Sequence, residues 1–204
     1  YAAGTYIDCP WSSFSRCILA DAGPNALTYS DQIDNAAWSK GSVTVGGPDT
    51  APDGTATADR VTEDTSTGTH YVYQSGTRTS VAEDLCISGY FKQAVLDRDV
   101  RLVVGSDGGP NYATATFDLS AGTTAGTSNG GTTTNARSFI VAAGNGWYYC
   151  ALVARVAAST AVFAEVDMSN TSTTSYTGTT GAVSVWRLCA YRSSVPTRGA
   201  QTTS

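Results

Sequence analysis

The feature that most constrains this chain is a series of short apolar runs bounded by clusters of Gly, Asp, Asn or Thr. In the run from 85 to 92, Leu85, Ile87 and Phe91 alternate with residues such as Ser88 and Tyr90, which predicts one apolar face and one mixed face. Such alternation is typical of a strand that packs one face on a core. The runs lie at 42–45, 57–62, 70–75, 85–92, 100–105, 113–119, 138–142, 147–156, 161–166 and 182–191.

About ten such strands predict an all-β protein. The composition agrees, since the 204 residues include 30 Thr and 21 Gly, which favour strands and turns over helices. We expect an antiparallel β-sandwich with jelly-roll topology, and at most one helical turn near Ser30 to Trp38. Two stretches rich in Thr, Ser and Gly, 121–134 and 169–181, carry too little apolar surface to pack, so they are predicted to be loops.

The first 24 residues have no clear period and end in the breaker Ala22-Gly23-Pro24. We therefore divide the chain into an N-terminal arm or linker at 1–24 and a β-sandwich domain at 25–204. The arm contains several large apolar side chains, including Tyr6, Trp11 and Phe14. We expect it to dock on another subunit, and the alternative is a lid over one open end of its own sandwich.

Charge and hydropathy exclude two classes of partner. The formal net charge is −5 and the pI is near 4.6, which disfavours nucleic acid because a phosphate-backbone binder needs a basic face. No stretch approaches the roughly 18 consecutive apolar residues of a membrane helix, so membrane insertion is not expected.

The five cysteines lack the spacing of a metal site or a redox motif. Cys86, Cys150 and Cys189 lie inside apolar runs, where free Cys usually behaves as a small core residue. Cys9 and Cys17 flank a short segment. A disulfide between them would close this segment into a loop, provided that the protein works outside a reducing compartment.

Catalytic chemistry has little support in the sequence. His70 is the only histidine, it lies in an alternating strand, and no G-x-S-x-G elbow is present. The glutamates are Glu63, Glu83 and Glu165. Glu63 and Glu83 are expected in solvated turns, whereas Glu165 alternates with apolar residues and could face a groove. We predict no catalytic residues and no enzyme activity, with a glycan-cleaving carboxylate pair as the least favoured alternative.

Several phrases in the chain carry a resemblance to a known family. They are 25–30 (NALTYS), 35–38 (NAAW), 51–59 (APDGTATAD), 89–92 (GYFK), 117–122 (FDLSAG), 144–148 (GNGWY) and 183–189 (VSVWRLC). Together they resemble the carbohydrate-binding-module-like jelly-roll domains, a concanavalin-like fold, that recur in tail fibres, head fibres and related virion proteins of tailed bacteriophages. The resemblance covers residues 25 to 197. Trp38, Trp147 and Trp186 are expected in the core or at its rim.

The resemblance implies a non-enzymatic structural or accessory protein of a phage virion, such as a fibre, spike or decoration protein. Its jelly roll would adhere to a host-surface or other glycan. The implied partners are other virion subunits and further copies of the chain, and the implied location is the virion surface, outside the cell. The main alternative is an assembly or decoration protein that binds no ligand.

Sugar binding by a sandwich requires aromatic rings that stack on the pyranose face, together with polar groups for the hydroxyls. Asn111 is next to Tyr112 in the sequence and is one such polar group. The predicted carbohydrate-binding residues are Tyr71, Tyr73, Tyr90, Lys92, Arg101 and Tyr112.

Jelly rolls of this kind commonly hold a structural calcium ion. The resemblance therefore implies calcium as the one candidate cofactor. Calcium requires several oxygen ligands, but no D-x-D-x-D-G loop is present. The candidate donors, which could equally be turn formers, are Asp49, Asp53, Asp59 and Asp118.

Overall fold

The computed structural model describes residues 24–106, 109–171 and 173–196. Its regular elements are thirteen strands within those residues. None of the described segments forms a helix with the length and apolar composition to span a membrane. The strands are β1 (Ser39–Gly41), β2 (Val43–Val45), β3 (Asp59–Glu63), β4 (Thr67–Thr77), β5 (Glu83–Val95), β6 (Asp99–Gly105), β7 (Tyr112–Asp118), β8 (Thr123–Asn129), β9 (Thr134–Gly144), β10 (Trp147–Val156), β11 (Ala161–Ser169), β12 (Ser175–Thr177) and β13 (Ala182–Arg192).

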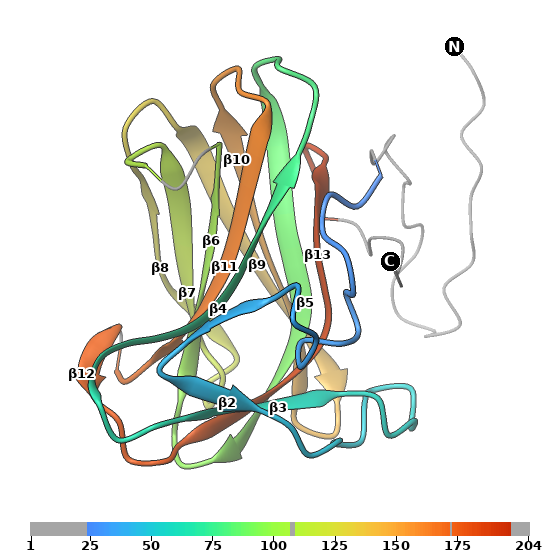
Figure 1. Ribbon diagram of the computed structural model, residues 1–204, viewed down its shortest axis with the longest axis vertical. Helices are drawn as coiled ribbons and strands as arrows, with labels where there is room; N and C mark the ends of the chain where they lie inside the picture. Colours follow the sequence, from blue (N-terminus) through green and yellow to red (C-terminus); the bar gives the residue numbers. More distant parts are fainter. Residues whose placement is uncertain (1–23, 107–108, 172, 197–204) are drawn as a thin grey trace.

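The strands form two antiparallel sheets that pack face to face (Figure 1). The seven-stranded sheet has the order β1-β4-β11-β6-β7-β8, with β12 paired to β4. The six-stranded sheet has the order β2-β3-β13-β5-β10-β9. Strand pairs of increasing sequence separation enclose β6 to β9: β5·β10, then β4·β11, then β3·β13. Successive pairs belong alternately to the six-stranded and the seven-stranded sheet, as in a long hairpin rolled on itself. This confirms the predicted jelly-roll sandwich.

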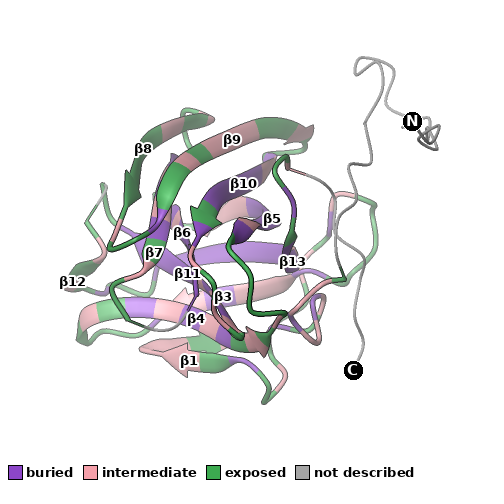
Figure 2. Ribbon diagram, turned by 90° about the horizontal axis from the view of Figure 1, so that it is seen from above, coloured by how far each residue is buried: buried purple, intermediate pink, exposed green. Residues whose placement is uncertain are grey.

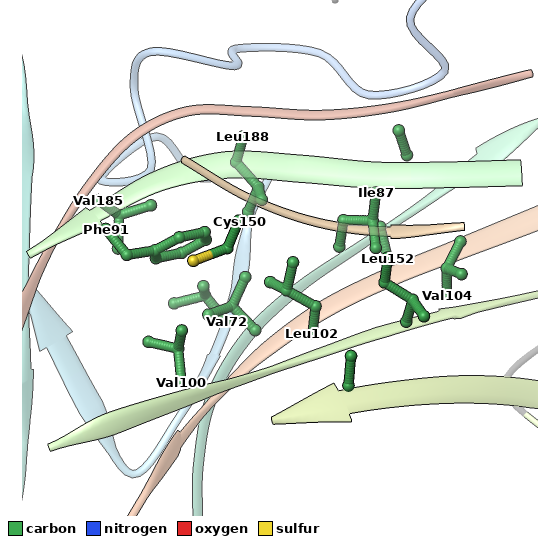
Figure 3. Close-up of a cluster of buried hydrophobic side chains, with 14 of the residues drawn as sticks. Val72, Ile87, Phe91, Val100, Leu102, Val104, Cys150, Leu152, Val185 and Leu188 are labelled. Atoms are coloured by element: carbon green, nitrogen blue, oxygen red, sulfur yellow. The ribbon is translucent and has the colours of Figure 1, made fainter. Parts of the chain in front are cut away.

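The core lies between the sheets and follows the alternation of the sequence. On β5, Leu85, Ile87 and Phe91 are 0–3% exposed and point into the core, as predicted. Figure 3 shows Ile87 beside Leu152 of β10 and near Leu102 of β6, and Phe91 beside Cys150 of β10 and above Val72 of β4, so side chains of both sheets meet in the core. The free, buried cysteines Cys86, Cys150 and Cys189 also agree with prediction.

In the segment from 25 to 38, three consecutive β-turns occupy residues 29–38, where at most one helical turn was predicted near Ser30 to Trp38. The amide N–H groups of Gln32, Asn35 and Trp38 each donate to the carbonyl three residues earlier. Leu27, Ile33 and Trp38 are 0–2% exposed, so the segment packs on the core without a helix.

Two predicted loops contain strands. β8 lies within 121–134 and β12 within 169–181. β8 is an edge strand that is mostly exposed (Figure 2), so its pairing with β7 requires no apolar face. The hydroxyl groups of Thr114 and Ser128 bond across this pair at 2.8 Å, which explains how a Thr- and Ser-rich segment forms a strand.

Glu63 and Glu83 do not lie in solvated turns, because each carboxylate is buried in an ion pair. The Glu63 carboxylate is 1% exposed and accepts two bonds from Arg98, at 2.8 and 2.9 Å. It also accepts from the Tyr176 hydroxyl at 2.6 Å and from the backbone N–H groups of Thr179 and Gly181. Glu83 pairs with two arginines, at 2.9 and 3.0 Å. The arginine partner of Glu63 is distant in sequence, which is why local composition missed this contact.

The predicted arm falls almost wholly outside the described residues, as do Cys9 and Cys17. The domain boundary at residue 24, the docking of the arm and the disulfide therefore stay predictions.

We expect Glu63→Gln to lower the free energy of unfolding by about 3–5 kcal/mol at pH 7, because it leaves the Arg98 charge buried without its counter-ion. Burial opposes ionisation of Glu63, but Arg98 and the other donors outweigh it and lower its pKa to about 2. The contribution of ionised Glu63 to stability is complete above pH 4.5 and is lost as pH falls toward 2. The difference in unfolding free energy between wild type and variant should therefore shrink between these two pH values. Urea unfolding at several pH values measures it.

Asp84→Asn is the matched control, since Asp84 is more exposed and lies 3.6 Å from Arg155. It should change stability by less than about 1 kcal/mol. Equal effects of the two variants would contradict the role assigned to Glu63.

Candidate functional site

The outer face of the seven-stranded sheet carries side chains unlike those of a solvated surface. Pairing of β4, β11 and β6 aligns two rows of outward residues across it. One row runs through Tyr71, Asp167 and Arg101, and the next through Tyr73 and Glu165. Their chain neighbours Val72, Val166 and Leu102 point the other way, into the core. The face is therefore built by strict alternation on three central strands.

Three aromatic rings form a continuous strip on this face. The ring centroids of Tyr71 and Tyr73 lie 5.9 Å apart, and those of Tyr73 and Phe163 lie 5.4 Å apart. All three rings are partly exposed. Tyr71 lies over Gly41 of β1, where a Cβ atom would overlap its ring. A glycine at this position thus makes room for the first ring of the strip.

Two carboxyl groups and one guanidinium adjoin the rings. Arg101 Nε donates to Asp167 Oδ2 at 2.8 Å, and the Asp167 side chain is 1% exposed although it lies on the outer face. Glu165 precedes Asp167 by two residues on β11, so both carboxyl groups lie on the same side of the strand. The site combines an aromatic platform with hydrogen-bonding groups held in place by an ion pair.

Burial raises the pKa of Glu165 to about 8, and the negative charge of Asp167 and a hydrogen bond between the two carboxyl groups add to the effect. Burial also raises the pKa of Asp167, while Arg101 opposes that rise. At neutral pH the proton therefore resides on Glu165, and Asp167 is the anion paired with Arg101. The three groups together therefore carry no net charge at pH 7.

The structure divides the six predicted carbohydrate-binding residues between two faces. Tyr71, Tyr73 and Arg101 lie together, and Tyr112 is on the same face at the start of β7, 39% exposed. Tyr90 and Lys92 are on β5 of the other sheet and cannot join them.

Tyr90 is 5% exposed and packs on Trp186 and Tyr149, with both centroid distances 5.2 Å. Lys92 Nζ lies 5.9 Å from the centroid of Trp147. As predicted, Trp38, Trp147 and Trp186 are buried, at 2%, 2% and 4% exposure. The aromatic residues near Tyr90 therefore belong to packing on the opposite sheet.

Sequence reasoning missed Phe163 and Asp167. Glu165 was noted because it alternates with apolar residues, and the same alternation places Phe163 and Asp167 on its side of the strand. The predicted strand stopped at Val166, whereas β11 continues to Ser169. Extending the alternation would have found Asp167, but the sequence contains no signal that pairs it with Arg101.

His70 lies on the inner side of β4, away from these rows. It is fully buried, its ring centroid is 4.8 Å from that of Tyr176, and its Nε2 lies 3.6 Å from Asp64 Oδ1. His70 therefore packs inside the end of the sandwich and does not reach the outer face.

Each of the four candidate calcium donors accepts hydrogen bonds from groups of the chain. Asp49 accepts from Ser184 and Arg60, Asp53 and Asp118 accept from backbone N–H groups in their own turns, and Asp59 accepts from Ile33 N. Across the described part of the chain, no three His, Cys, Asp or Glu side chains are arranged to hold a metal ion. For Asp53 and Asp118, these contacts are those of turn formers.

No protein-family model matches the chain, and no curated protein matches it. Among solved structures, it is similar to TmCBM61 in complex with beta-1,4-galactotriose, with 10% identity, a TM-score of 0.49, and coverage of 84% of this chain and 100% of that one.

It is also similar to the enzymatically active domain of bacteriophage CBA120 tailspike protein 4, with 12% identity and a TM-score of 0.47. That match covers 81% of this chain but only 21% of the tailspike chain. A third similar structure is a putative sugar binding protein from Bacteroides thetaiotaomicron, with 12% identity, a TM-score of 0.42 and coverage of 84% and 95%. Similarities at this level do not assign a function.

We expect Glu165 to titrate near pH 8 and Asp167→Asn to lower that midpoint, because the substitution removes the charge that disfavours Glu165 ionisation. Labelling glutamate with ¹³C gives three side-chain carboxyl signals, since the chain has three glutamates. Glu63 is the internal control and should show no transition above pH 4. Three midpoints below pH 5 would contradict the proposed proton on Glu165.

Proposed function

We propose that the chain is a non-enzymatic glycan-binding jelly roll whose binding surface is the outer face of the seven-stranded sheet. The observation that carries the proposal is the strip of Tyr71, Tyr73 and Phe163 beside the Glu165, Asp167 and Arg101 groups. Partly exposed rings on a sheet face cost about 25 cal/mol for each Å² of apolar surface left in water, so a ligand that covers them gains that energy.

The chemistry of the face matches a sugar. Aromatic rings stack on the apolar face of a pyranose, and carboxyl groups bond to its hydroxyls. The strip crosses from β4 to β11, and Glu165 is on β11 beside it. A glycan lying along the strip would therefore place hydroxyl groups near Glu165. Because β4, β11 and β6 fix the side chains, the surface is organised before a ligand arrives.

The same geometry argues against glycoside cleavage. Hydrolysis requires two carboxyl groups that flank the scissile bond. Glu165 and Asp167 are instead two residues apart on one strand, hydrogen-bonded to each other, and Asp167 is buried against Arg101. Neither can therefore act from the opposite side of a sugar ring held on the strip.

We further propose that the domain works at the surface of a phage virion, outside the cell, together with other virion subunits and further copies of the chain. The support is the ordered set of phrases between residues 25 and 197. Detection of the chain on purified particles by a specific antibody tests the location, and its absence from them would refute it.

Tyr73→Ala is expected to weaken glycan binding at least about tenfold, since it removes the central ring of the strip. Gly41→Ala should weaken it as well, because the new methyl group displaces the Tyr71 ring. Binding is measured by a polysaccharide panel and then by calorimetry on the best binder.

Gly46→Ala is the matched control: a Cβ atom there meets open space, and the backbone suits any residue. It should bind as the wild type does. Unchanged binding by Tyr73→Ala, or no binding to any glycan by the wild type, would refute this surface as the site.

Incubation with the same panel should release no new reducing ends. If polysaccharide turnover is found and Glu165→Gln abolishes it, the chain is an enzyme and the non-enzymatic proposal is wrong. Turnover that persists in Glu165→Gln and stays with the chain through repurification would also refute the proposal, whereas turnover lost on repurification belongs to a contaminating hydrolase.

A further inference from the structure

The guanidinium on the proposed surface is already engaged. Arg101 Nε donates to Asp167 Oδ2 at 2.8 Å, and the Asp167 carboxylate is buried behind it. Breaking such a pair leaves a buried charge without its counter-ion, which is costly. Arg101 is therefore held by the protein and is poorly placed to bind an acidic ligand.

Among the described residues, Arg101 is the one basic side chain on this face. Lys40 is on the edge strand β1, but its Nζ donates to the carbonyls of Asn35 and Trp38. Arg78 and Arg98 are paired with Glu83 and Glu63. The remaining described basic residues belong to strands of the six-stranded sheet: Arg60, Lys92, Arg137, Arg155, Arg187 and Arg192.

We infer that this surface selects uncharged glycans and rejects those that carry carboxylate or sulfate groups, an inference that rests on the proposed function. An acidic group on the ligand would be taken out of water beside Arg101 and Asp167, whose charges already neutralise each other, and the described residues of this face offer it no unpaired cation. Taking a charge out of water without a counter-ion is costly, whereas neutral hydroxyls can donate to the same carboxyl groups. The three groups, neutral together at pH 7, match an uncharged ligand.

The test compares one polysaccharide in two charge states. The uncharged polysaccharide that the full chain binds best is oxidised at its primary alcohols with TEMPO, which converts hexose units to uronates and keeps the linkages. At pH 7, affinity for the oxidised form should be at least about tenfold lower than affinity for its uncharged parent.

Asp167→Asn provides the reciprocal test, because it frees Arg101 and removes one acid. This variant should bind the oxidised polysaccharide better than the wild type does, by several-fold. Should it fail to fold, the wild type is compared at pH 7 and at pH 9: ionisation of Glu165 adds a negative charge to the face, so the discrimination against the oxidised form should increase. Asp84→Asn, on the other sheet, should discriminate as the wild type does.

The outcomes separate the two proposals. If the oxidised form binds as tightly as its parent, the charge selectivity is wrong while glycan binding stands. If the chain binds acidic polysaccharides alone, the selectivity is likewise wrong. If it binds no glycan of either kind, the proposed function fails, and the selectivity fails with it.

Discussion

The Glu63–Arg98 pair is the interaction on which the arrangement of the two sheets depends. Glu63 ends β3 in the six-stranded sheet, while Arg98 lies just before β6 in the seven-stranded sheet. Tyr176 of β12 donates to the same carboxylate, and β12 pairs with Thr67–Thr69 of β4. Because Tyr71 and Tyr73 follow on β4, this buried contact also fixes where the aromatic strip begins. One carboxylate thus connects the packing of the core to the geometry of the outer face.

A central strand normally exposes neutral or β-branched residues on its solvent side, and β11 departs from this. Its inward positions are apolar, whereas Glu165 and Asp167 occupy outward positions between β4 and β6. A buried carboxylate is tolerable there because Arg101 neutralises it and Glu165 retains a proton. Folding alone would be served by apolar residues of similar volume. The polar groups are therefore not explained by stability, which agrees with the proposed binding role of this face.

The sequence was sufficient for the fold class and for the face that each side chain of β5 presents, because period-two alternation depends only on neighbours along the chain. It was insufficient for register. Tyr73 meets Glu165, and Asp167 meets Arg101, through pairings between segments that lie far apart in sequence. The same limit explains Glu63, whose arginine lies 35 residues away. β8 was missed for another reason, since an edge strand held by backbone bonds and hydroxyl pairs needs no apolar pattern.

The two outer faces differ in whether the chain covers its own aromatic residues. On the six-stranded sheet, Trp147 Nε1 donates to the Thr50 carbonyl and Trp186 Nε1 to the Thr57 hydroxyl, while Ala51 and Ala58 belong to the same buried cluster as Tyr90. The loop before β3 thus satisfies both indoles and completes that cluster. The tyrosines and Phe163 of the seven-stranded sheet remain partly exposed beside polar groups. Aromatic content alone marked both faces as candidates, and the difference in cover favours the seven-stranded sheet as the proposed binding surface.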